Sequence, residues 1–324
     1  MEDNFTINFQ LRRQRRKRLI RFLLLIFVGI ITAYFSFNQF IKNKTNDSVN
    51  ENIQVSSLEN VVEETLAGTK GTYGIAIKNL KEGQSYYKNE HKIFEAGSLY
   101  KLWIMAEAFK QIQDGELAED QLLSEDVANL SQKFNIDPDS AELKEGTVSL
   151  TVRDALRQMI TISHNYAALL LTEKIKLSSV ATFLKTNGLT QSTVGTNGDA
   201  PTSTPSDIAL FYEKLYKGEL ANQQYTEEMI DLLKSQQLDD GIPKYLPDKS
   251  KVAHKTGDIG WFKHDGGKVF TDKGDYIIVV MSESDSPSGA QERISLVSKA
   301  VFDYFMLLNT STISSAATAA SLPL

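Results

Sequence analysis

The chain has 324 residues, a net charge of −6 and no cysteine, so disulfides and thiolate metal sites are excluded. Residues 1–21 carry seven basic and two acidic side chains, a local charge of +5 that leaves −11 for the remainder. A body this acidic is poorly suited to polyanions, which argues against nucleic acid as a partner.

The basic cluster precedes an apolar segment, FLLLIFVGIITAYFSF, at residues 22–37. Its 16 uncharged residues fall short of the roughly 20 that span a bilayer, but Arg21 can snorkel and residues 38–41 can lie at the interface. We therefore predict a transmembrane anchor at 19–41, with a cytoplasmic basic tail at 1–18 and an extracytoplasmic body. The alternative is a cleaved signal peptide, which the bulky aromatic residues ending the segment disfavour.

A polar segment at 42–55 has almost nothing to bury, and we interpret it as a flexible linker. The folded body is expected to span 56–308. Ser56 and Glu59 have the spacing of a capping box and predict that a short amphipathic helix begins there. Strand patterns follow at 72–78 and 85–88, with the turn residues Lys81-Glu82-Gly83 between them.

A long helix is predicted at 98–113, and the stretch 116–230 is mostly helical in pattern. Strand patterns return near the end of the body, at 251–253, 268–271 and 276–281, before a closing amphipathic helix. The low-complexity segment 309–324 is predicted to be a disordered tail.

The strands thus come from both ends of the body and the helices from its middle. This order predicts an α+β fold, in which helices flank one antiparallel sheet built from the two ends of the chain. An all-helical subdomain is then inserted between the two sets of strands.

Ser98 and Lys101 lie in the stretch FEAGSLYKLWIMAEAF, at the expected start of the long helix. A spacing of three residues places both side chains on one helix face, which suits a serine nucleophile activated by an amine. The alternative is a Ser98 that only caps the helix beside a solvated lysine. The same Ser-x-x-Lys pattern at Ser85 and Lys88 falls on a strand, where the two side chains point to opposite faces.

Two further motifs follow in order, Ser163-His164-Asn165 between predicted helices and Lys255-Thr256-Gly257 on a late strand. Together with Ser98-x-x-Lys101 they resemble the serine β-lactamase and penicillin-binding protein superfamily, and class A β-lactamases most closely. The resemblance covers roughly residues 56–308.

The resemblance implies a catalytic role for three of these residues. Ser98 would be the acylated nucleophile, Lys101 its base or part of a proton relay, and Ser163 the donor of a proton to the leaving nitrogen. A lysine serves as a base only if its pKa is lowered, and an apolar setting together with Lys255 would lower it.

The resemblance also implies how the substrate is held. Asn165 would bind the substrate side-chain amide, and Lys255, Thr256 and Gly257 would hold its carboxylate. The backbone N–H groups of Ser98 and Asp258 would form the oxyanion hole. No cofactor or metal is implied.

The sequence departs from the class A pattern at two points. His164 stands where these enzymes usually carry aspartate, and we expect a structural substitution, with a direct role of His164 in the site as the alternative. The loop before Thr202, which carries the deacylating glutamate in class A enzymes, reads GLTQSTVGTNGDAP at 188–201 and contains no glutamate. Its only acid is Asp199, for which a role in stabilising the turn is expected.

These features predict a monomeric, membrane-anchored serine hydrolase that β-lactams acylate at Ser98. Hydrolysis of the resulting acyl-enzyme is expected to be slow. One alternative is a penicillin-binding D,D-peptidase acting on D-Ala-D-Ala peptides of the cell wall. Another is a penicillin-acylated sensor, although about twenty residues before the membrane leave no room for an enzymatic output domain. An inert scaffold is the third.

Overall fold

The computed structural model describes residues 57–81, 83–195 and 199–319, with the side chains of residues 250 and 308–319 excepted. The predicted basic tail, anchor and linker lie outside these residues. Among the helices within the described ranges, none is both long and apolar enough to cross a membrane.

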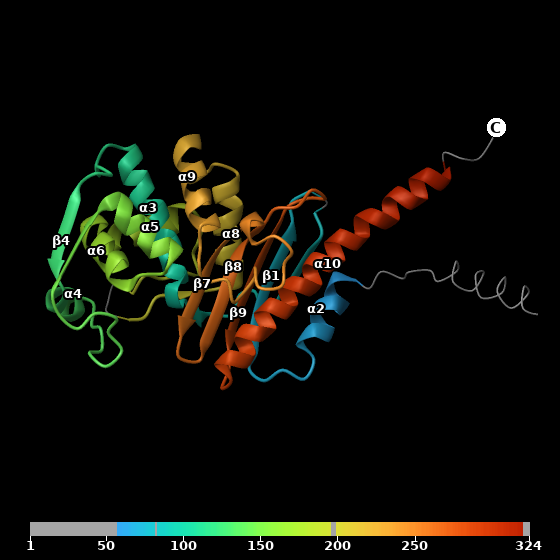
Figure 1. Ribbon diagram of the computed structural model, residues 1–324, viewed down its shortest axis with the longest axis horizontal. Helices are drawn as coiled ribbons and strands as arrows, with labels where there is room; N and C mark the ends of the chain where they lie inside the picture. The colour runs from blue at the N-terminus through green and yellow to red at the C-terminus, as the bar shows by residue number, and fades with distance from the viewer. Residues whose placement is uncertain (1–56, 82, 196–198, 320–324) are drawn as a thin grey trace, which may run out of the picture. The chain divides into compact units, whose positions relative to one another are not determined.

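A five-stranded antiparallel sheet lies at the centre of the fold, with strand order β2-β1-β9-β8-β7 (Figure 1). The bounds of the strands are β1 Thr72–Asn79, β2 Ser85–Lys88, β7 Val252–Ile259, β8 Phe262–Val269 and β9 Tyr276–Glu283. The N-terminal hairpin pairs with the C-terminal strands through β1 and β9. The predicted α+β fold with an antiparallel sheet built from both ends of the chain is confirmed.

The hairpin of β7 and β8 is much longer than the sequence patterns at 251–253 and 268–271 predicted. Polar residues and glycines occupy most of both strands, as in HKTGDI and FKHDGGKV, so the hydrophobic alternation typical of a strand is lost. Ladder hydrogen bonds and burial form these strands instead, and Lys255, Asp265 and His264 are all buried in them.

Two helices cover one face of the sheet, α2 at Leu58–Leu66 and α10 at Pro287–Ala319 (Figure 1). The N-cap of α2 is Ser57, whose hydroxyl accepts from the N–H of Asn60, so the predicted capping box at Ser56 and Glu59 is wrong by one residue. The helix α10 continues to Ala319 and so includes part of the segment for which the sequence predicts a disordered tail.

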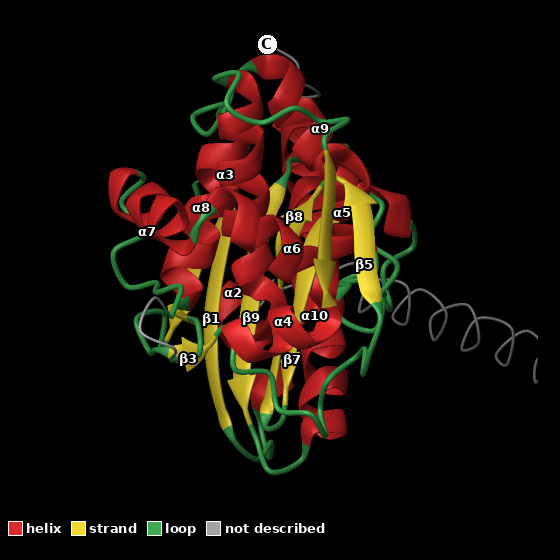
Figure 2. Cartoon of the chain, turned by 90° about the vertical axis from the view of Figure 1, so that its left-hand side faces the viewer, coloured by secondary structure: helices red, strands yellow, loops and turns green. Residues whose placement is uncertain are grey.

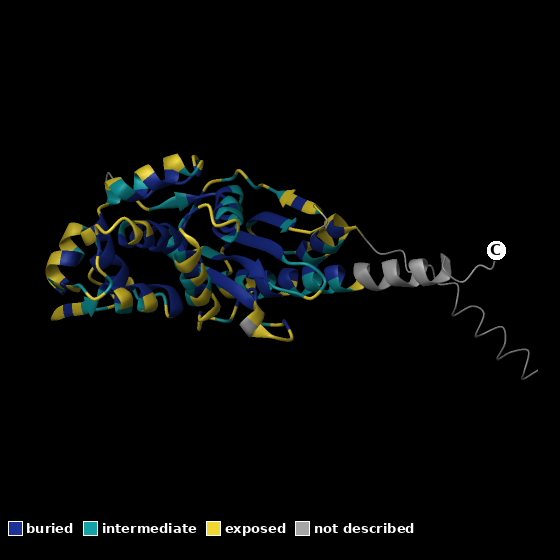
Figure 3. Cartoon of the chain, turned by 90° about the horizontal axis from the view of Figure 1, so that it is seen from above, coloured by how far each residue is buried: buried dark blue, intermediate teal, exposed yellow. Residues whose placement is uncertain are grey.

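The central strand β9 is buried on both faces, as the dark colour of the sheet in Figure 3 shows. Ile278 and Val280 pack with α2 and α10, whereas Ile277 and Val279 pack with the helices of the opposite side. Burial on both faces is why this strand has a continuous apolar sequence rather than an alternating one.

The middle of the chain packs against the other face of the sheet and is mostly helical (Figure 2). Its helices are α3 Lys101–Gln113, α4 Val127–Lys133, α5 Val152–Thr161, α6 Asn165–Ile175, α7 Leu177–Thr186, α8 Pro205–Tyr216 and α9 Gln223–Lys234. The helix α3 is buried on all sides from Lys101 to Phe109, which makes it the central helix of this region and places Trp103 in the core.

The prediction that this inserted region is all helical is wrong. Strands β4, Leu122–Asp126, and β5, Thr147–Thr151, form a two-stranded antiparallel sheet on its surface. A second pair joins β3, Phe94–Glu95, to β6, Thr202–Ser203. The strands β4 and β5 are short and largely exposed, and β3 and β6 have only two residues each, so none of them carries much of the hydrophobic alternation that identifies a strand in a sequence.

Candidate active site

A cleft of about 580 Å³ opens between the helical region and the β7 edge of the sheet. Residues from all three motifs or their neighbours line it, including Ser98, Asn165 and Asp258. Tyr100 and Tyr166 also line the cleft. Side chains more than 150 residues apart in the sequence therefore meet at one site.

Ser98 lies in a 3-10 turn, Gly97–Tyr100, and α3 begins only at Lys101. The predicted helix start at residue 98 is therefore wrong by three residues. Ser98 is not a helix cap, because the N-cap residue of the 3-10 turn is Ala96 and that of α3 is Tyr100. Gly97 has a φ of +48°, and a Cβ there would lie 3.0 Å from the backbone nitrogen of Asp258. A side chain at this position would separate the turn from β7.

Lys101 is fully buried at the first position of α3 and is held by the second motif. Its Nζ donates to the carbonyl oxygen of Ser163 at 2.5 Å, to Ser163 Oγ at 3.1 Å and to Asn165 Oδ1 at 2.7 Å. Three acceptors match the three donors of an ammonium group, which fixes the direction of the side chain.

Ser163 joins the two lysines of the site. Its Oγ lies 3.1 Å from Lys101 Nζ and 3.0 Å from Lys255 Nζ, and Lys255 also donates to the carbonyl of Thr256. The backbone of Ser163 has a φ of +59°, a left-handed conformation that is uncommon for residues with a side chain. The short link between α5 and α6 thus turns the serine hydroxyl between the two amines at a cost in backbone strain.

The pKa values of both lysines are lowered. Burial, followed by the positive charge of Lys255, holds the pKa of Lys101 well below its usual value, while the Glu142 carboxylate acts in the opposite direction. Burial lowers the pKa of Lys255 to about 7 against the opposing charge of Asp265. Burial and a neighbouring cation, the two causes expected to lower the pKa of Lys101, are therefore both present in the structure.

The strand β7 approaches the 3-10 turn closely at Gly257. A Cβ on this residue would lie 2.7 Å from the carbonyl oxygen of Ala96 and 3.1 Å from Leu99 Cγ. Only glycine allows this contact, which places Thr256 and Asp258 beside the turn of Ser98. The side chain of Asp258 points to solvent and pairs with Lys263.

A buried ion pair lies behind Lys255 on the opposite side of β7. His254 Nδ1 is 2.9 Å from Asp265 Oδ1, and Asp265 Oδ2 accepts from the N–H of Ile242 at 2.8 Å. Burial opposes protonation of His254, but the charge and hydrogen bond of Asp265, together with the Asp239 carboxylate 3.9 Å from Nε2, raise its pKa overall. The alternation of side chains along a strand places His254 on the face opposite Lys255, but no sequence pattern indicates its acidic partner.

Glu142 is a cleft residue that the sequence reasoning missed. It follows α4 in the loop before β5, and its Oε2 accepts from the backbone N–H of Asn165 at 2.7 Å. Its other oxygen lies 3.6 Å from His164 Nδ1. Nothing in the spacing of this polar loop indicates a contact with a motif 23 residues further on.

His164 occupies the N-cap position of α6, and its Nδ1 accepts from the N–H of Ala167 at 3.4 Å. This is the capping function that an aspartate side chain commonly serves. The contact agrees with the structural substitution expected at this position.

The loop without a glutamate is held by a buried acid outside it, Asp207 on α8. The carboxylate of Asp207 accepts from the N–H of Gln191 and from the hydroxyl of Ser192. Asp199 lines the cleft. Within the described part of the chain, no cluster of three or more histidine, aspartate or glutamate residues has a geometry that fits a metal ion.

The fold and the three motifs are typical of one class of serine hydrolases, and comparison with known proteins identifies the family. The chain belongs to the beta-lactamase enzyme family, which matches residues 57–305, and with it to the serine β-lactamase and penicillin-binding protein superfamily. No curated protein matches the chain significantly.

Solved structures share the fold at low sequence identity. A β-lactamase from Sphaerobacter thermophilus has a TM-score of 0.68 and 24% identity, covering 77% of this chain and 96% of that one. The structure of PBP-A has a TM-score of 0.67 and 23% identity, covering 77% and 95%. The TLA-1 extended-spectrum β-lactamase has a TM-score of 0.64 and 19% identity, covering 77% and 98%.

Proposed function

We propose that this protein is a class A β-lactamase-like serine hydrolase that forms an acyl-enzyme through Ser98 with β-lactams and releases it slowly. The observation that carries the proposal is the hydroxyl of Ser163, held between two buried amines beside the turn of Ser98. Such a chain of groups can move a proton from the nucleophile to a leaving nitrogen.

In the proposed reaction, Ser98 Oγ attacks the carbonyl carbon of the cyclic amide and its proton passes to Lys101. The oxyanion is stabilised by the backbone N–H groups of Ser98 and Asp258. The C–N bond then breaks, and the nitrogen receives a proton through Ser163. Lys255 and Thr256, with the close-packed Gly257, bind the substrate carboxylate, and Asn165 binds its side-chain amide.

Slow deacylation rests on the loop at 188–201, which has no glutamate to activate water. The same feature favours a second candidate function, a penicillin-binding D,D-peptidase-like enzyme acting on peptidoglycan peptides. A solved structure similar to this chain (24% identical) is a variant of PBP-A in acyl-enzyme complex with penicillin G. A penicillin-acylated sensor is a further alternative, because it would be acylated at Ser98 by the same chemistry.

The proposed location rests on the N-terminal sequence rather than on the described fold. We propose a single-pass anchor at 19–41 with the catalytic domain outside the cytoplasm, where β-lactams and cell-wall peptides are encountered. A fusion of a reporter to either end, assayed for protease accessibility on intact cells, tests this orientation.

Intact-protein mass recorded over time with benzylpenicillin tests the chemistry, with Ser98→Ala as control. We expect an adduct that persists and that the control lacks. An adduct that disappears as free penicilloate accumulates would refute slow deacylation. Absence of any adduct with several β-lactams and with D-Ala-D-Ala peptides would refute the acyl-enzyme proposal.

A further inference from the structure

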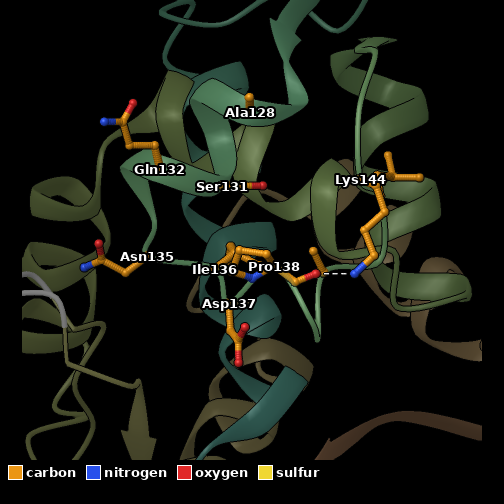
Figure 4. Close-up of a pocket in the computed structure, with 10 residues that line it drawn as sticks. Ala128, Ser131, Gln132, Asn135, Ile136, Asp137, Pro138 and Lys144 are labelled. Atoms are coloured by element: carbon orange, nitrogen blue, oxygen red, sulfur yellow. Dashed lines mark hydrogen bonds between the residues drawn. The ribbon is translucent and has the colours of Figure 1, made fainter.

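The loop that connects α4 to β5, residues 134–146, forms one wall of the cleft and is unusually well anchored to the second motif. Phe134, Asn135, Ile136, Ser140 and Glu142 line the cleft from this loop. Its outer side borders an open hollow of about 590 Å³, in which Asn135 and Ile136 also take part (Figure 4). With cavities on both sides, the loop depends on specific contacts for its position.

The loop has its own internal structure at its outer end. Lys144 reaches across to the backbone carbonyl of Pro138, as the dashed line in Figure 4 shows. The N–H of Asp139 and the hydroxyl of Ser140 bond back to Asp137. These bonds make the tip a compact unit, so its connection to α6 decides where the whole loop lies.

Two consecutive residues of α6 make that connection. The N–H of Asn165 donates to Glu142 Oε2 at 2.7 Å, and Tyr166 Oη donates to the carbonyl of Leu143 at 2.9 Å. Tyr166 Oη also lies 2.7 Å from Ser131 Oγ on α4. The residue that binds Lys101 through its side chain is therefore held through its backbone by Glu142.

Glu142 also acts on Lys101 through its charge, in addition to anchoring the loop. Lys255 on β7 is the cation whose charge lowers the pKa of Lys101, His164 lies beside Glu142 at the start of α6, and Tyr100 is the titratable neighbour in the preceding turn. Glu142 is the carboxylate whose charge acts on Lys101 against that of Lys255. A carboxylate at this place favours the ammonium form, which binds Ser163 and Asn165.

We propose that Glu142 is a positioning residue of this active site, which holds Asn165 in place and offsets the positive charge of Lys101. The inference rests on the proposed acylation at Ser98, and it adds an acidic residue from a loop outside the three motifs. Glu142 acts through Asn165 and Lys101, without contact to the reacting atoms.

Two substitutions separate the two parts of this role. Glu142→Gln keeps an oxygen that accepts from the N–H of Asn165 and removes the charge, whereas Glu142→Ala removes both. Glu145→Ala, at an exposed position of the same loop, is the matched control. All are made in the full chain, and the second-order rate of acylation by benzylpenicillin is measured by intact mass from pH 5 to 9.

We expect Glu142→Gln to retain the wild-type rate at alkaline pH and to move the acid limb of the profile to lower pH. The reason is that loss of the carboxylate lowers the pKa of Lys101, so the neutral amine persists in more acidic solution. Glu142→Ala should slow acylation by roughly 10- to 100-fold at all pH values, since Asn165 and Lys101 lose their fixed orientation. The control should match wild type.

A second measurement does not depend on acylation. The ¹³Cε signal of Lys101, assigned by its loss in Lys101→Gln, is titrated in lysine-labelled wild type and in Glu142→Gln. A lower titration midpoint in the variant supports the proposal. Equal midpoints, or an unchanged acid limb and an unchanged rate in both variants, would overturn it. Failure of wild type to form any adduct would count against the proposed function instead, and the titration would still decide the role of Glu142.

Discussion

The two regions that meet at the cleft hold their lysines in different ways. Lys255 belongs to the sheet, where the backbone ladder between β7 and β8 fixes its position and Gly257 brings the strand against the turn of Ser98. Lys101 belongs to the helical region, where side-chain and loop contacts to Ser163 and Asn165 fix it. The sheet therefore supplies a rigid edge, whereas the helical region supplies a constellation that depends on loops.

The largest expected effect is on the rate of acylation, and it should differ between substitutions of Lys101 and Lys255. Lys101→Ala should reduce the rate of acylation by about 10³-fold, because general-base catalysis is lost. Lys255→Ala should reduce it by roughly 10- to 100-fold, the size expected for one charged hydrogen bond to the substrate. Saturation kinetics with a slowly reacting β-lactam measure both, and equal losses in the acylation step would contradict the assigned roles.

The burial of Lys255 should cost stability in a pH-dependent way. Its folded pKa of about 7 lies below the unfolded value, near 10.4, so between these values the unfolded chain binds more protons and stability rises with pH. Lys255→Met should be more stable than wild type by about 1–4 kcal/mol at pH 6. The difference should shrink by roughly 1 kcal/mol per pH unit between pH 8 and 9.5.

Urea unfolding of wild type and Lys255→Met across this pH range measures the effect. Lys251→Met, at an exposed position before β7, is the control and should stay within about 0.5 kcal/mol of wild type. A stability difference that did not vary with pH would show that Lys255 is not the titrating group.

The rigid edge can be tested at Gly257. A methyl group there would meet the carbonyl of Ala96 at 2.7 Å, so Gly257→Ala should destabilise the fold by about 2 kcal/mol and slow acylation as the turn of Ser98 shifts. Ile259→Ala, at a largely exposed position of the same strand, should be nearly neutral. Thermal unfolding measures both, and equal melting temperatures would show that the turn can move away without cost.

The smallest effect concerns the loop contacts of the helical region. Tyr166→Phe removes the hydroxyl that joins Leu143 and Ser131, which should cost about 1 kcal/mol. Hydrogen exchange should increase within residues 134–146, while the sheet keeps its protection. Tyr225→Phe on α9 is the matched control, and the same exchange pattern in both variants would contradict an anchoring role for Tyr166.

Much of the fold was predictable because its signals are local. The apolar run of β9 and the hairpin of β1 and β2 are determined by neighbouring residues, so the two-ended sheet could be inferred. The strands of β7 and β8 were underestimated and β4 and β5 were missed, because polar or exposed strands lack the alternation on which such inference depends. The observed N-cap of α2 is Ser57 rather than the predicted Ser56, because two adjacent serines offer the same capping hydroxyl.

The sequence by itself determined the chemical groups of the site, because three short motifs specify two serine hydroxyls, two lysine amines and an asparagine amide. Only the tertiary structure decided how these groups are tuned. It buries both lysines and lowers their pKa values, and it turns Ser163 between them. It also brings Glu142 to Asn165 from a loop and places Asp265 on the opposite side of β7 from Lys255. Burial and long-range charge depend on packing between distant segments, and no local pattern of residues records that packing.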